Sequence, residues 1–194
     1  MPGVLHAKSG LRVVLKWKIF RPDSVIAAVI PLNQMKNLKL ELEVIGKIEA
    51  AFGDVVLGEG DSIYCASTEW GPSPPIPELK DCSTNDWSLL SDSELELGHN
   101  TLCFVNSDGF RYYLPAFMTW AIRRHKESDN TICDHAIYSL DPRRHDFMDT
   151  FSSGQLHAVL DFLDYCSGQT ETLDSVVAKK HAALIRTQMN SDTG

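Results

Sequence analysis

The chain has 194 residues, of which 43% are hydrophobic and 23% charged, and this balance is typical of a globular protein with material for one core. Its formal net charge of −8 argues against binding to nucleic acid or to an anionic membrane, because both require a basic face. Residues 1–40 hold seven of the 18 Lys and Arg residues and one acid, Asp23, so the remainder is more acidic than the total suggests.

Cysteine usage and hydropathy indicate a reduced, water-exposed environment. The five cysteines are widely spaced with no CxxC pair, which is typical of reduced thiols in a cytosolic protein and predicts a cytoplasmic location. The most apolar run, SVIAAVIPL from Ser24, is shorter than the roughly 20 residues that span a bilayer. Pro31 and Gln34 follow it without the small-residue cleavage site of a secretory signal.

The first element with a clear pattern is LRVVLKWKIF, from Leu11, whose alternation of apolar and polar residues favours a strand. A helix over 38–52 follows, ended by Gly53. Its apolar residues recur at helical spacing and are expected to face the core: Leu38, Leu42, Ile45, Ile48 and Phe52. The change of composition at Met35 raises the hypothesis that translation begins there and that 1–37 is a basic extension outside the fold.

Between Val55 and Trp87 the pattern is irregular, and WGPSPPIPELKDC contains four prolines that exclude a helix or an interior strand. We expect a long connection with a short strand at SIYCAS, and connections of this length are often functional. In SDSELELG, Ser91 and Glu94 have the spacing of a capping box, which predicts a helix over 91–97.

The segment NSDGFRYYLPAFMTWAIRRH predicts a helix over 108–126, capped by Ser107 or Asp108 and closed by basic residues that suit its carboxyl end. Pro115 either kinks this helix or begins a second one. Its core-facing stripe is Phe110, Tyr113, Leu114, Phe117, Met118, Ala121 and Ile122.

Three further segments complete the fold. TICDHAIYSL suits a helix or a buried strand, and we favour a helix. FSSGQLHAVLDFLDYCSG predicts a helix over 153–167, capped by Ser152 with Gln155 and ended by Gly168. An amphipathic helix over 171–189 and a tail, 190–194, follow. The predicted fold is a mainly α single domain, small α or α+β, over 38–189.

HNTLCFVNSDGFRYYLPAFMTWAI, followed about thirty residues later by FSSGQLHAVLDFL, resembles an uncharacterised bacterial family, Domain of Unknown Function 6714. The matching residues are Ala51 and Phe52, Trp87, Gly109 to Ala116, and Gln155 to Leu163. The resemblance covers roughly 38–166 and leaves out the first 34 residues. It implies no reaction.

Aromatic and basic residues offer candidates for a recognition surface, because Tyr, Trp and Arg dominate interface hot spots. The apolar stripe assigns Tyr113 to the core. The remaining candidates for binding are Arg111, Tyr112, Trp120, Trp70 and Trp87.

No metal, cofactor or catalytic residue is predicted. His99 and Cys103 are four residues apart, but Gly98 and Asn100 interrupt a helix there and the close cysteine pairs of structural zinc sites are missing. A nucleophilic pair of Cys133 or Cys103 with a histidine such as His157 has no supporting motif. The sequence also lacks GxSxG, P-loop, GxGxxG and HExxH motifs.

These observations favour a non-enzymatic, protein-binding domain, although the enzyme question stays open. An acidic domain suits a basic protein partner, and one version is an immunity-type protein that masks a basic toxin or nuclease. Neither nucleic acid nor a membrane is expected as a partner, and the oligomeric state is left open. The alternative is an enzyme with a pocket near Arg111, Tyr112 and His99, beside the EWGPSPP loop.

Overall fold

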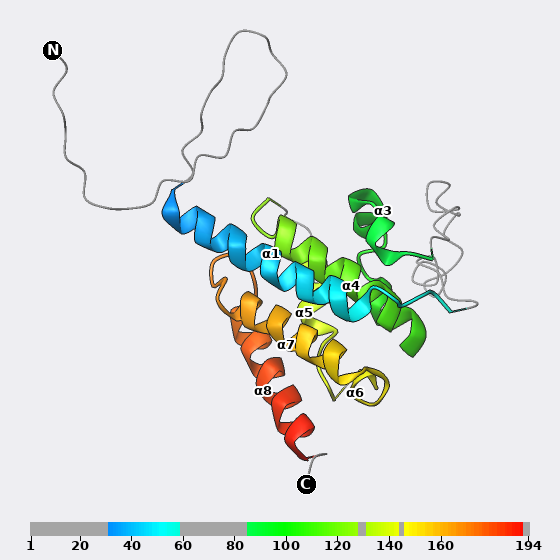
Figure 1. Cartoon of the computed structure of the whole chain (residues 1–194). Coiled ribbons are helices and arrows are strands. Elements are labelled where there is room, and N and C mark those ends of the chain that lie inside the picture. Colours follow the sequence, from blue (N-terminus) through cyan, green and yellow to red (C-terminus); the bar gives the residue numbers. More distant parts are fainter. Residues whose placement is uncertain (1–30, 59–84, 128–130, 144–145, 192–194) are drawn as a thin grey trace, which may run out of the picture. The chain divides into compact units, whose positions relative to one another are not determined.

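Helices account for all the regular secondary structure of the computed structural model, which describes residues 31–58, 85–127, 131–143 and 146–191. Within these ranges there are seven α-helices, two 3₁₀ helices and no strand, so the prediction of a mainly α fold is confirmed (Figure 1). The strands predicted at LRVVLKWKIF and SIYCAS lie outside the described residues. In chain order the elements are α1 (Leu32–Phe52), η2 (Trp87–Leu89), α3 (Asp92–Leu97), η3 (Thr101–Cys103), α4 (Ser107–Arg124), α5 (Ile132–Tyr138), α6 (Phe147–Thr150), α7 (Ser153–Ser167) and α8 (Ser175–Ser191).

The chain divides into two units, Met1–Leu38 and Lys39–Gly194. In the first unit the structure describes residues 31–38, and α1 begins there at Leu32, before the predicted 38–52 segment. Met35, the hypothetical translation start, lies within α1. The role of 1–37 as an extension stays a prediction.

The buried stripe of α1 differs from the predicted one. Val44, Ile45, Ile48 and Phe52 are buried as their spacing requires, but Leu42 is 60% exposed. Leu38 is 43% exposed, so the expectation that Leu38 and Leu42 face the core is wrong. The neighbouring Glu41 side chain is instead largely enclosed, and it bonds to Lys126, which follows α4, and to Tyr165 of α7.

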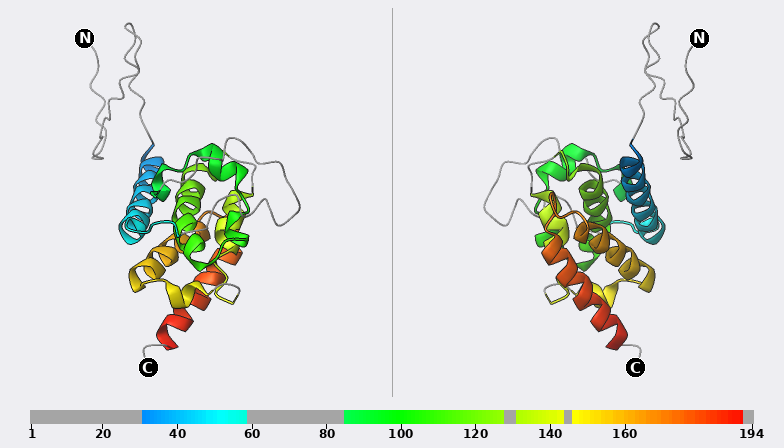
Figure 2. Two further views of the ribbon diagram at one scale, coloured as in Figure 1. Left: turned by 90° about the vertical axis from the view of Figure 1, so that its right-hand side faces the viewer. Right: turned by 90° about the vertical axis from the view of Figure 1, so that its left-hand side faces the viewer.

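α4 is the central helix of the second unit. Asn106 caps it by accepting hydrogen bonds from the backbone N–H groups of Asp108 (2.9 Å) and Gly109 (3.0 Å), so the predicted caps, Ser107 and Asp108, are wrong by one and two residues. The helix runs on through Pro115 without a break. All residues of 109–122 except Arg111 are buried, because α3, α5, α6, η2 and η3 all contact this helix (Figure 2).

The carboxyl-terminal half contains the most extensive helix packing, between α7 and α8. The α7 capping box is confirmed: Ser152 Oγ accepts from Gln155 N (3.2 Å), and Gln155 Oε1 accepts from Ser152 N (3.0 Å). The predicted start of the last helix at Glu171 is wrong, since α8 begins at Ser175 after the Asp174 carboxylate accepts a hydrogen bond from Val177 N (3.1 Å). This helix continues to Ser191, beyond the predicted end at 189.

α6 is a single helical turn that sequence reasoning did not predict. Its formation follows from packing: the Phe147 ring lies 5.9 Å from that of Phe110, and Phe151 lies 5.6 Å from Phe52. These aromatic contacts connect the 146–151 segment to α4 and to the end of α1. The favoured helical reading of TICDHAIYSL is confirmed as α5.

Candidate protein-binding surface

The end of α1 and the start of η2 meet at one carbonyl group. Phe52 O accepts hydrogen bonds from Val55 N (3.1 Å) and from the indole Nε1 of Trp87 (2.8 Å). Trp87 is buried, so it holds the 85–90 segment against the end of α1. The two segments therefore adjoin each other at this carbonyl group.

Large apolar side chains are exposed on these segments. Val56 is 63% exposed, Leu89 66%, and Leu97 at the end of α3 45%. An exposed leucine is unremarkable by itself, but apolar side chains that gather within a polar rim are typical of protein interaction sites.

Acidic residues are next to these apolar residues along the chain. Asp54 is exposed just before Val56, and the segment 86–96 contains four acids and no basic residue. We define the acidic patch as Asp54, Val56, Asp86, Leu89, Glu96 and Leu97. Asp86 caps η2 through the N–H (2.9 Å) and hydroxyl (2.6 Å) of Ser88, and these bonds lower the pKa of its carboxyl group and keep it ionised at neutral pH.

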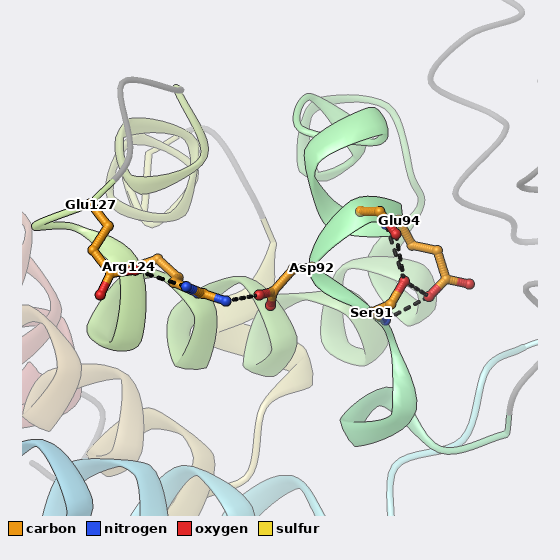
Figure 3. Close-up of polar contacts among 6 residues, drawn as sticks. Ser91, Asp92, Glu94, Arg124 and Glu127 are labelled. Carbon is orange, nitrogen blue, oxygen red and sulfur yellow. Dashed lines mark hydrogen bonds and ion pairs between the residues drawn. The ribbon is translucent and has the colours of Figure 1, made fainter. Parts of the chain in front are cut away.

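α3 is fixed at both its start and its flank (Figure 3). The predicted capping box is present: Ser91 Oγ accepts from Glu94 N, and Glu94 Oε2 accepts from Ser91 N and Ser91 Oγ. At the flank, Arg124 of α4 donates to Asp92 and, at 2.7 Å, to Glu127. The Arg124 side chain is therefore neutralised by two carboxylates.

Ion pairing within the described residues leaves the surface acidic. Five basic side chains are held in ion pairs with carboxylates: Lys47, Arg124, Lys126, Arg143 and Arg186. Because Lys47 and Arg124 each engage two carboxylates, the pairs involve more acids than bases. Exposed acids outside these pairs include Glu49, Asp54, Glu96, Asp108 and Asp149.

The aromatic candidates do not lie at the surface. Tyr112 is fully enclosed and its ring stacks edge-on against Tyr113 at 4.9 Å, while Trp120 and Trp87 are also buried. The assignment of Tyr112 and Trp120 as surface residues is wrong, because α4 is covered on every side rather than on one face. Trp70 lies outside the described residues.

Arg111 is the one predicted contact on α4 that reaches solvent. It is partly buried, and its Nε atom is enclosed with no hydrogen-bond partner among the described residues. Because Tyr112 is enclosed, it cannot line an open pocket with Arg111 and His99, as the alternative enzyme hypothesis requires.

His99 lies in a different cluster. Its ring centroid is 5.7 Å from that of His135, and the exposed thiol of Cys103 is 3.7 Å from His135 Nδ1. The thiol therefore pairs with His135 and not with His157, whose Nδ1 atom contacts Ser153 O at 2.6 Å. Burial raises the pKa of the Cys133 thiol to about 11. In the described part of the chain no group of three or more His, Cys, Asp or Glu side chains could hold a metal ion.

Sequence reasoning did not identify Val56, Asp86 or Leu89. The run of four acids without a base in 86–96 was an available signal, but exposure of the apolar residues depends on tertiary packing. None of the described helices is long and apolar enough to cross a membrane.

Comparison with known proteins adds one finding. A family of unknown function, DUF6714, has a model that matches residues 40–184. The chain belongs to this family. The DUF6714 match starts in α1, extends past the predicted 38–166 range and ends within α8, so it includes the acidic patch, every described helix from η2 to α7 and the start of α8. No curated protein and no solved structure matches the chain.

Proposed function

We propose that this DUF6714 domain binds a basic protein through the acidic patch. The observation that carries the proposal is the combination, on adjoining segments, of exposed Val56 and Leu89 with Asp54, Asp86 and the acids of α3. Apolar contact supplies affinity at the centre of an interface, while carboxylates at its rim favour a partner of opposite charge.

Binding through an apolar centre with an acidic rim has two measurable properties. Charge attraction between exposed groups extends about 10 Å at 0.1 M salt and about 3 Å at 1 M, so association weakens as salt rises. Removing one exposed apolar contact at the centre costs about 1 kcal/mol or more when that contact is a hot spot. Both effects are expected for the same partner.

The test is co-purification with the full-length chain from its host at low and high salt. We compare the natural protein with two patch variants. The first combines Asp54→Lys and Glu96→Lys, and the second carries Leu89→Ser alone. The matched control, Asp108→Lys with Asp149→Lys, makes the same change of charge on exposed residues outside the patch.

A basic protein is expected to be retained at low salt by the natural chain and by the control, and lost by both patch variants. Equal loss with the control would contradict the patch as the binding surface. Retention that does not depend on salt would contradict the charge argument. In the immunity-type version the partner is a basic toxin or nuclease, and its activity falls as the complex forms.

A further inference from the structure

A chain of hydrogen bonds runs from the surface into the core at the carboxyl end of α4. His125 is 5% exposed and lies between two hydroxyl groups: its Nδ1 atom faces Thr172 Oγ1 at 2.5 Å, and its Nε2 atom faces the Tyr165 hydroxyl at 2.9 Å. Tyr165 in turn donates to Glu41 Oε1 at 3.3 Å, and Lys126 donates to the same oxygen at 2.8 Å.

The direction of each bond follows from the carboxylate end. A carboxylate only accepts, so the Tyr165 hydroxyl donates its proton to Glu41 and its oxygen accepts from the Nε2–H group of His125. The neutral imidazole then has no proton on Nδ1. This nitrogen accepts the proton of the Thr172 hydroxyl.

The ionisation of the buried groups supports this arrangement. Burial, followed by the nearby Lys126 ammonium, lowers the pKa of His125, so its imidazole is neutral at pH 7 and can accept a proton. Burial and Glu41 raise the pKa of Tyr165, so the phenol keeps the proton that it donates.

Thr172 is the exposed end of the chain. It lies in the connection between α7 and α8, where its N–H donates to Gln169 O at 3.3 Å and the buried neighbour Leu173 anchors the turn. A hydroxyl that reaches solvent, bonded to an imidazole that a third group orients, is the arrangement that activates an oxygen nucleophile.

We propose that Thr172 is a nucleophile that accepts an acyl group from an activated ester, with His125 as its general base. Thr172 Oγ1 forms a bond to the carbonyl carbon as its proton moves to His125 Nδ1. The bond from that carbon to the leaving oxygen then breaks, and His125 returns the proton to it. The products are O-acyl-Thr172 and an alcohol.

Charge near Thr172 selects the ester. Glu171 is exposed beside it, and Asp174 lies two residues further on, with its carboxylate accepting from the Tyr138 hydroxyl at 2.6 Å. These acids repel an anionic donor, so uncharged or cationic esters are the preferred class. Tyr165 and Glu41 act as positioning residues, since neither reaches the acyl donor.

The test treats the full chain with p-nitrophenyl acetate and measures acetylation of each threonine by peptide mass spectrometry. Thr187 is the internal control, because it is exposed and its hydroxyl donates to Ala183 O at 2.9 Å rather than to an imidazole. General-base assistance predicts that Thr172 reacts on the order of 100-fold faster than Thr187. The rate at Thr172 is expected to rise with pH through a midpoint below 6.5, since the pKa of His125 is lowered.

Variants separate chemistry from folding. Thr172→Ser is expected to keep the rapid reaction, and His125→Gln to lower it to the rate of Thr187. Tyr165→Phe is expected to slow it, because the acceptor that orients the imidazole is lost. Circular dichroism checks that each variant is folded. Equal rates at Thr172 and Thr187 in the natural protein, or a rate that folded His125→Gln leaves unchanged, would overturn the proposal.

Discussion

Replacement of Trp87 separates its packing role from the binding role that the sequence predicts for it. Its side chain is 4% exposed and its indole N–H donates to Phe52 O at 2.8 Å. Truncation of a buried tryptophan to alanine costs about 3–5 kcal/mol, because the cavity left behind is only partly filled. That is a large share of the 5–15 kcal/mol by which domains are typically stable.

Trp87→Phe is expected to cost less. It keeps an aromatic ring but removes the hydrogen bond to Phe52 O, whose net contribution is about 1 kcal/mol. Phe52 O keeps its second donor, Val55 N, so the carbonyl group is not left without a partner. We therefore expect the free energy of unfolding to be lowest for Trp87→Ala, intermediate for Trp87→Phe and highest for the natural protein.

The assay is urea denaturation followed by far-ultraviolet circular dichroism at neutral pH. Leu89→Ala is the matched control on the same 3₁₀ helix, and because Leu89 is 66% exposed its effect should stay within about 0.5 kcal/mol. The reasoning would be refuted by a Leu89→Ala loss as large as that of Trp87→Ala. It would also fail if Trp87→Ala changed the free energy of unfolding by less than about 0.5 kcal/mol.

Three further predictions concern stability. Gly46→Ala is expected to raise the free energy of unfolding by about 0.5–1 kcal/mol, since Gly46 lies within α1 and an added Cβ meets no atom within 4 Å. Gly53→Ala should lower the free energy of unfolding, because its Cβ would lie 2.8 Å from a backbone oxygen of the preceding turn. Ser152→Ala should cost about 1 kcal/mol through loss of the α7 cap, with Ser153→Ala near neutral in the same urea denaturation assay. Burial lowers the pKa of His181 in the folded state. As pH falls through about 6.5, the unfolded chain therefore binds more protons than the folded chain, and the folded state loses stability. His181→Gln should make this loss of stability between pH 7 and 5 less steep.

Local signals in the sequence predicted most of the helices. The capping boxes at Ser91 and Ser152 act within three residues of chain, so spacing alone was sufficient to place α3 and α7. The late start of α8 also has a local cause, the Asp174 cap, and an N-cap residue at this position was a signal that the amphipathic pattern concealed. Phe151 and Phe147 induce α6 through contacts with distant helices, and no local pattern encodes them.

The site was harder to predict, because burial of a side chain depends on how many neighbours its helix has. Treating α4 as a surface helix with one apolar stripe placed Tyr112 and Trp120 at the surface, but five elements cover this helix. The chain of hydrogen bonds from Thr172 to Glu41 joins residues that are far apart in sequence, so only the three-dimensional structure brings them together.

The acidic patch is supported by short elements, and this affects how the protein exchanges its amide protons. η2 has three residues and α3 has six, too few for a helix to persist without tertiary contacts, and few buried residues anchor them, among them Trp87 and Leu95. Opening of this segment exposes less of the core than unfolding of α4, so it needs less free energy. We expect the amides of 87–97 to exchange with solvent hydrogen well before those of α4, and a bound partner to slow that exchange. The proposed binding surface would then belong to a segment whose local opening needs less free energy than that of the central helix.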